Sequence, residues 1–176
     1  MKCTKRMSRA LNRCGKEFKK IKLKLALLFG LLFFLLGVFT WSFGGETHRI
    51  LTLYDFPRMA MPVVFMYVFW SIVYIIMGTA VFGIVSCSES YNKAFCQKIS
   101  FYLTMSLLFT NVAYLLFFSA IAPFMAFVIY LISAMFCFFA LIISKRFYIL
   151  WTIILALYFA WLVYSMLIPL GFLIIN

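Results

Sequence analysis

The side chains of this sequence that can do chemistry are mainly indoles and phenols, and they recur at helical spacing. Residues three or four positions apart lie on one face of a helix. Indole and phenol rings offer flat apolar faces with one polar group each, which suits stacking against a large flat ligand. Three such faces are predicted, and they hold Trp70 with Tyr74, Asn111 with Tyr114, and Tyr158 with Trp161 and Ser165.

The pattern alone leaves two interpretations open. The aromatic stripes can be core packing, with Asn111 bonded to a neighbouring helix because its amide needs a partner in hydrocarbon. Alternatively, the faces converge on an aromatic-lined pocket for a large, flat, apolar ligand. Composition does not choose between these interpretations.

Ionisable groups are missing from the stretches that would hold such a pocket. No Asp, Glu, Lys, Arg or His falls within the apolar stretch of any predicted span, the first of which starts at Leu25. Pumps and ion-coupled carriers keep such groups at membrane depth, and hydrolytic chemistry needs them as acids and bases. The chain also has no CxxC or HExxH motif, and His48, its single histidine, lies in a predicted loop. We therefore predict no metal site and no required cofactor.

The elements that position these residues must be membrane-spanning helices. Of the 176 residues, 67% are apolar and 11% are charged, which is too apolar for a soluble domain of this length. Only helices and closed barrels satisfy the backbone in lipid, and long unbroken apolar runs favour helices. We therefore predict an all-α membrane protein, with residues 25–176 forming a five-helix membrane domain. The helices are expected at about 23–43, 62–86, 99–121, 123–144 and 147–175.

The distribution of basic residues predicts the orientation of the chain. Ten of the sixteen Lys and Arg residues lie in the first 24 positions, so residues 1–24 are a basic juxtamembrane segment. This segment is either an amphipathic helix or a disordered tail, and anionic lipids, not nucleic acid, are its expected partner. With the N-terminus inside, the inner segments hold 14 Lys and Arg residues, and the outer segments hold only Arg49 and Arg58. The positive-inside rule then predicts a multi-pass plasma-membrane protein with a cytoplasmic N-terminus and an external C-terminus.

Residues 57–80 carry a recognisable motif. Trp70 follows Pro57 by thirteen residues, with Pro62 between them, and Tyr74 is followed by Met77-Gly78-x-Ala80. Later in the chain come Asn111-x-x-Tyr114 and Tyr158-x-x-Trp161. Together these blocks resemble the TspO/MBR family, the tryptophan-rich sensory proteins and translocator proteins (peripheral benzodiazepine receptors), as a divergent, bacterial-type member.

The resemblance implies a five-helix bundle, often dimeric, that binds porphyrins, haem, sterols or isoquinoline-type drugs beneath its first loop. It favours a pocket over core packing, because it selects the residues that the helical faces had already selected. By position, Pro57 and Pro62 would shape the lid, and the pocket would take Trp70, Tyr74, Asn111, Tyr114, Tyr158, Trp161 and Ser165.

Three functions follow as expectations. The first is binding or sensing of a tetrapyrrole (porphyrin or haem) or another large apolar ligand. The second is light- and oxygen-dependent porphyrin degradation with Trp70 and Trp161 as redox partners, which is weakened because Leu51 stands where the family has a loop tyrosine. The third is transport of a lipid-like molecule, or a scaffold role in the membrane.

Overall fold

The computed structural model describes residues 23–43, 55, 57–58, 60–86, 93–145 and 149–176, and five α-helices make up the regular structure of these ranges. The helices are α2 (Leu23–Ser42), α4 (Val63–Ser86), α5 (Lys93–Phe118), α6 (Pro123–Ser144) and α7 (Ile149–Ile175). Each is long and apolar enough to cross a membrane, because about 20 apolar residues span the hydrocarbon core. The predicted all-helical, five-helix architecture is confirmed, and it indicates a multi-pass membrane protein.

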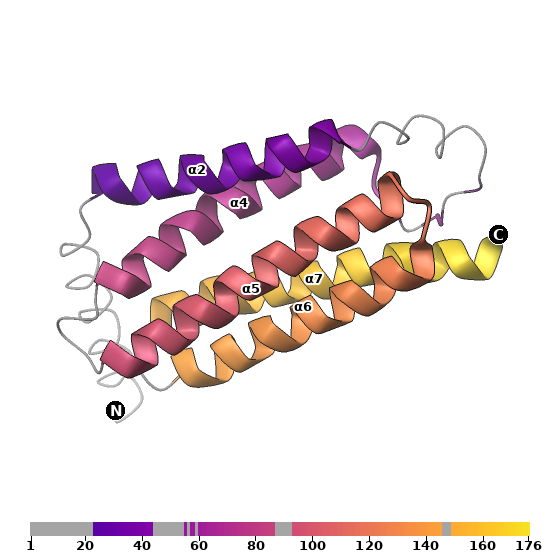
Figure 1. Ribbon diagram of the computed structural model, residues 1–176. Helices are drawn as coiled ribbons and strands as arrows, with labels where there is room; N and C mark the ends of the chain where they lie inside the picture. Colours follow the sequence, from indigo (N-terminus) through magenta and orange to yellow (C-terminus); the bar gives the residue numbers. More distant parts are fainter. Residues whose placement is uncertain (1–22, 44–54, 56, 59, 87–92, 146–148) are drawn as a thin grey trace, which may run out of the picture.

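Several predictions concern residues outside the described ranges. The basic segment of residues 1–24 lies almost wholly outside them, as do His48, Arg49 and most of the predicted 44–61 loop. Helix α2 begins at one end of the bundle and α7 finishes at the other (Figure 1).

Helix α5 is placed differently from the predicted span at about 99–121. It begins at Lys93, because lysine and glutamine are good helix formers and extend the helix as an exposed first turn. It ends at Phe118, and Ile121 then adopts a φ of 50°, a left-handed conformation that β-branched residues rarely take. The Ala122 amide donates to the Leu116 carbonyl at 2.9 Å across this turn, and Pro123 opens α6.

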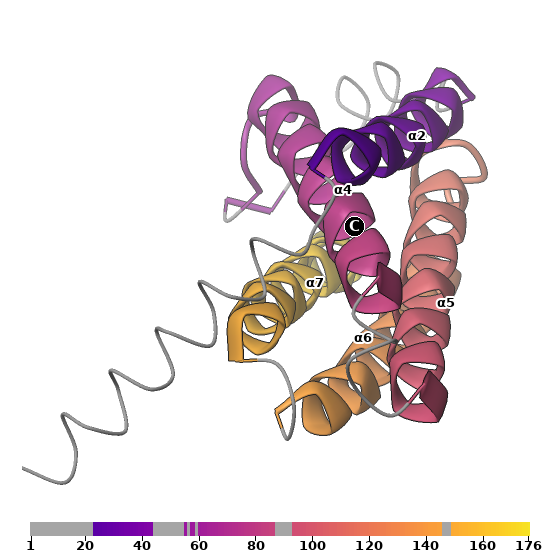
Figure 2. The same ribbon diagram turned by 90° about the vertical axis from the view of Figure 1, so that its left-hand side faces the viewer.

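The five helices form two layers. Helix α2 lies along α4, and this pair covers a layer in which α5 packs along α6 and α6 along α7 (Figures 1 and 2). Close backbone approaches between the layers, from α4 to α5 and from α4 to α7, are fewer than those within the layers. The seam between α4 and α7 is therefore one of the looser seams of the bundle.

Two glycines set the distance between α2 and α4. A Cβ added at Gly78 would lie 2.7 Å from the Phe29 carbonyl oxygen and 2.8 Å from the Gly30 Cα. A Cβ added at Gly30 would lie 2.8 Å from the Ile75 carbonyl oxygen. Small residues let membrane helices approach closely. Close van der Waals packing matters here because apolar side chains gain no hydrophobic free energy by moving from lipid into a helix interface.

Candidate functional site

The aromatic faces predicted on α4 and α7 meet inside the bundle. Trp70 and Trp161 are arranged edge to face with ring centroids 5.7 Å apart, and the Trp70 ring lies 5.7 Å from that of Tyr74. Trp161 also stacks on Phe69 at a centroid distance of 5.3 Å. Three of the predicted site residues therefore belong to one aromatic cluster that joins α4 to α7.

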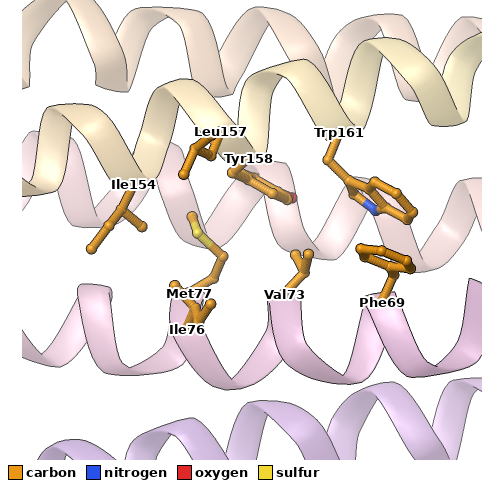
Figure 3. Close-up of a pocket in the computed structure, with 8 residues that line it drawn as sticks. All are labelled: Phe69, Val73, Ile76, Met77, Ile154, Leu157, Tyr158 and Trp161. Carbon is orange, nitrogen blue, oxygen red and sulfur yellow. The ribbon is translucent and has the colours of Figure 1, made fainter.

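A cavity of about 270 Å³ lies between α4 and α7 beside this cluster. Each helix contributes four side chains at the spacing of one helical face, and Figure 3 shows them facing one another. Among the predicted residues, Tyr158 and Trp161 line the cavity, whereas Trp70 and Tyr74 lie behind the lining and contact Trp161 or each other. The lining residues are Phe69, Val73, Ile76 and Met77 of α4, and Ile154, Leu157, Tyr158 and Trp161 of α7.

Trp161 carries an unsatisfied polar group at the cavity. Its Nε1 is buried and has no hydrogen-bond partner within the part of the chain that the structure describes. In Figure 3 the nitrogen lies on the side of the indole nearer Tyr158. An unpaired buried donor costs about 1–3 kcal/mol, and hydrocarbon offers no acceptor in place of water. Because the nitrogen is buried, a ligand acceptor would reach it and remove that cost only after the indole ring turned toward the cavity.

Tyr158 exposes its ring to the cavity while its hydroxyl joins a buried polar cluster. The phenol oxygen lies 3.3 Å from Thr110 Oγ1 and 3.4 Å from Ser106 Oγ. Ser133 completes this cluster by a reciprocal pair: Ser106 Oγ donates to the Ser133 carbonyl at 2.9 Å, and Ser133 Oγ donates to the Ser106 carbonyl at 2.8 Å. We call Ser106, Thr110, Ser133 and the Tyr158 hydroxyl the hydroxyl cluster. It fixes the position of the Tyr158 ring from α5 and α6.

Asn111 is engaged inside the bundle and does not line the cavity. Its Oδ1 accepts a hydrogen bond from the Tyr74 hydroxyl at 2.7 Å, and its Nδ2 donates to the Leu107 carbonyl at 2.9 Å. The amide therefore has the interhelical partner that its burial requires. These contacts match the core-packing interpretation of Asn111, and a direct role in ligand binding stays a prediction.

Tyr114 and Ser165 lie outside the cavity lining. The Tyr114 hydroxyl is 3.2 Å from the Tyr67 hydroxyl, and its ring packs on Phe118 at a centroid distance of 4.7 Å. Ser165 Oγ donates to the Trp161 carbonyl at 2.9 Å, within its own helix. Neither side chain is brought to the cavity, so their predicted ligand contacts also stay predictions.

The described residues before α4 are attached to the far end of α7. The Asp55 amide donates to Asn176 Oδ1 at 3.3 Å, and Asn176 Nδ2 donates to the Asp55 carbonyl at 2.9 Å. Pro57 is buried against Gly171, where an added Cβ would lie 2.9 Å from the proline Cγ. The predicted lid residue Pro57 therefore contacts α7 directly.

The second predicted lid residue, Pro62, is exposed and immediately precedes α4. Beside it, the Met61 amide donates to the Tyr164 hydroxyl at 3.0 Å. The Tyr164 ring lies 5.3 Å from that of Trp161. A chain of contacts thus connects the start of α4 with the aromatic cluster.

The chain matches no protein-family model and no curated protein. Its resemblance to the TspO/MBR family therefore depends only on the sequence motifs at residues 57–80, 111–114 and 158–161. Across the described ranges, no three His, Cys, Asp or Glu side chains form a group that could hold a metal ion. Cys96 and Cys137 are buried, and the other three cysteines lie outside those ranges.

Most of the cavity lining was missed in the sequence because it is purely apolar. Phe69, Val73 and Met77 lie one turn apart on the face beside Trp70 and Tyr74, and Ile154 precedes Tyr158 and Trp161 in the same way. Such residues are indistinguishable from lipid-facing ones by type. The available signal was the i, i+4 spacing of Phe69, Val73 and Met77 to one another and of Ile154 to Tyr158, once the α4–α7 pairing is known.

Proposed function

We propose that this chain binds a large, flat, apolar ligand in the cavity between α4 and α7. The observation that carries the proposal is a cavity walled by the rings of Tyr158 and Trp161, beside which a buried indole N–H has no partner in the described part of the chain. Aromatic walls favour flat rings, and a single donor orients one acceptor atom of the ligand. A tetrapyrrole is the ligand class that best combines these features.

The size of the cavity indicates how such a ligand is held. At about 270 Å³ it is slightly smaller than the usual range of about 300–1,000 Å³ for small-molecule sites. A whole tetrapyrrole would exceed it, so part of the macrocycle would lie in the α4–α7 seam against lipid. A sterol-like molecule would fit by the same partial insertion, although it lacks flat aromatic faces to stack.

The lining favours a metal-free porphyrin over haem. Haem iron is held by a histidine, cysteine, methionine or tyrosine side chain. Of the lining residues, Met77 supplies a thioether and Tyr158 a phenol, and that phenol is already engaged in the hydroxyl cluster. Met77 is therefore the residue that would hold haem, while a free-base porphyrin needs only the rings and the Trp161 N–H.

We extend the proposal to the family of the protein, its orientation in the membrane and its cellular location. We infer a TspO-like sensor or translocator in the plasma membrane, with its N-terminus cytoplasmic and residues 1–24 against anionic lipids, and with a second copy as partner. The five-helix bundle supports the family proposal. Pro57 and Asn176 also lie together at the C-terminal end of α7, the end at which the resemblance places the loop over the pocket. The count of basic residues supports the orientation.

Porphyrin degradation is the second candidate, because Trp70 and Trp161 are in ring contact. An excited porphyrin would take one electron from Trp161 and pass it to dissolved oxygen, giving superoxide that attacks the macrocycle, and Trp70 would re-reduce the Trp161 radical. Illumination of the porphyrin-loaded protein, with heat-denatured protein as the control, tests it. Loss of the Soret band beyond the control supports degradation, and equal loss contradicts it.

The binding proposal is tested by titrating protoporphyrin into the protein in nanodiscs and following the Soret band. The informative variant is Trp161→Phe, and its matched control is Trp151→Phe. Trp151 is also a tryptophan of α7 whose buried Nε1 has no partner among the described residues, but it lies outside the cavity lining. We expect Trp161→Phe to weaken binding about tenfold and Trp151→Phe to leave it within about twofold, in line with the loss of one hydrogen bond in a dry site. Equal affinities in all three proteins would contradict the proposed site.

A further inference from the structure

The cavity between α4 and α7 has one deep wall and one open rim. Met77 and Tyr158 form the deep wall, with 1% and 3% of their surfaces exposed. At the rim, Leu157 is 69% exposed, Phe69 is 42% exposed and Ile76 is 41% exposed. In a membrane bundle the exposed flank of a helix contacts lipid. The cavity therefore opens sideways.

This rim lies at the depth of the lipid acyl chains. Val73 is ten residues beyond the first residue of α4, and Leu157 is eight beyond the first residue of α7. At 1.5 Å per residue these positions are about 15 Å and about 12 Å along their helices. Because α4 and α7 start at opposite ends of the bundle (Figure 1), the opening is remote from both ends. It faces the middle of a hydrocarbon core about 30 Å thick.

Other routes out of the cavity are obstructed by contacts. Toward the loop end, Pro57 is buried against Gly171, and the Met61 amide is bonded to Tyr164. Toward the bundle centre, the buried side chains of Met77 and Tyr158 close the cavity, and the hydroxyl cluster holds Tyr158 in place. The seam between α4 and α7 is loosely packed, so few contacts must open for a ligand to pass there.

We propose that the ligand is a molecule dissolved in the bilayer, which enters and leaves sideways between α4 and α7 past Leu157. This rests on the proposed function, since it assigns a route and a source to the ligand of that site. A lipid-dissolved molecule reaches the rim by diffusion in the membrane plane and exchanges an apolar environment for an apolar one. Stacking and the Trp161 N–H then supply the preference for the cavity. The loop end of the bundle, where Pro57 contacts Gly171, then stays closed while the ligand enters and leaves.

The rates of protoporphyrin binding and release in nanodiscs test the route. Leu157→Trp narrows the rim, and Ile153→Trp is its matched control: it makes the same change on an exposed residue of α7 outside the lining. Asn176→Ala removes the side chain that bonds Asp55 and so loosens the loop end. Association and dissociation are followed by the Soret band after mixing and after competitor lipid is added.

A bulkier side chain at the entrance slows both association and dissociation of the ligand. A bulkier side chain that only fills the cavity weakens binding and speeds dissociation instead. We expect Leu157→Trp to slow association and dissociation together by about tenfold, and we expect the other two variants to stay within about twofold of the unaltered protein. The route is contradicted if Leu157→Trp only speeds release or prevents binding, or if Asn176→Ala alone speeds association. Absence of a saturable Soret shift in the unaltered protein would instead refute the proposed function, so the two failures are distinguishable.

Discussion

The Tyr74 hydroxyl donates a 2.7 Å hydrogen bond to Asn111 Oδ1, which joins α4 to α5 in the buried centre of the bundle. Both side chains were selected from the sequence as ligand contacts. In the structure they satisfy each other, and Tyr74 also packs its ring on Trp70 and Trp41. The pair therefore connects the two layers of helices and supports the aromatic cluster from behind.

Breaking this pair should destabilise the protein in a non-additive way. Tyr74→Phe leaves the Asn111 oxygen without its donor, so we expect the free energy of unfolding to fall by about 1–2 kcal/mol. Asn111→Leu strands the Tyr74 hydroxyl at a similar cost, and the double variant should lose less than the sum. Reversible unfolding in mixed micelles measures all three. Simple addition of the two single effects would show that the bond is not formed.

The hydroxyl cluster should stabilise the contact between α5 and α6. Ser133→Ala removes the hydroxyl that reaches the Ser106 carbonyl and Thr110 Oγ1. Hydrogen bonds between membrane helices are worth about 0.6 kcal/mol on average and about 1.7 kcal/mol at most, so a loss of about 1 kcal/mol is expected. The control is Thr79→Val, whose hydroxyl bonds the Ile76 carbonyl within α4. A Ser133→Ala protein no less stable than this control would contradict the role of the cluster.

Gly78→Ala should destabilise α2–α4 packing, against the direction of helix propensity. Alanine would ordinarily favour a helix over glycine by about 1 kcal/mol. Here the added Cβ would meet the Phe29 carbonyl oxygen at 2.7 Å and the Gly30 Cα at 2.8 Å, and backbone atoms have little freedom to move aside. Thermal unfolding of Gly78→Ala should therefore occur several degrees below that of the unaltered protein. A higher midpoint would show that the two helices are not held this close.

The contact between Met61 and Tyr164 should protect the residues before α4. Tyr164→Phe removes the oxygen that accepts the Met61 amide proton at 3.0 Å. We expect that amide to exchange its hydrogen at least tenfold faster in the variant, because its proton is no longer held. The Met66 amide, bonded to the Pro62 carbonyl, serves as the internal control. Unchanged exchange at Met61 would indicate that the loop end is not fixed by α7.

The architecture follows from physical constraints that the sequence displays directly. Apolar length, proline positions and the absence of internal charges fix where helices cross hydrocarbon, and five helices were predicted on that basis. The early start of α5 at Lys93 was missed because hydropathy locates only the apolar part of a helix. The backbone hydrogen bonds of α5 begin earlier, in the polar residues before that part. The left-handed turn at Ile121 was missed because its residue type gives no signal for it.

The candidate site was predicted in part, for a different physical reason. Spacing places Tyr158 and Trp161 on one face, and this needs no knowledge of neighbouring helices. Whether Tyr74 faces a ligand or Asn111 depends on the distance between α4 and α5, which is a tertiary property. The rim residues Phe69 and Leu157 become meaningful only when α4 is known to lie beside α7, since each is otherwise an ordinary lipid-facing side chain.

If the cavity between α4 and α7 is the ligand site, filling it with a larger side chain should weaken ligand binding directly. Val73 lines the cavity from α4, and Val64 is a 72% exposed valine of the same helix outside the lining. Protoporphyrin titrations of Val73→Phe and Val64→Phe in nanodiscs, read by the Soret band, compare the same change at both places. We expect at least tenfold weaker binding for Val73→Phe and unaltered binding for Val64→Phe. Equal, undiminished binding by both variants would contradict it.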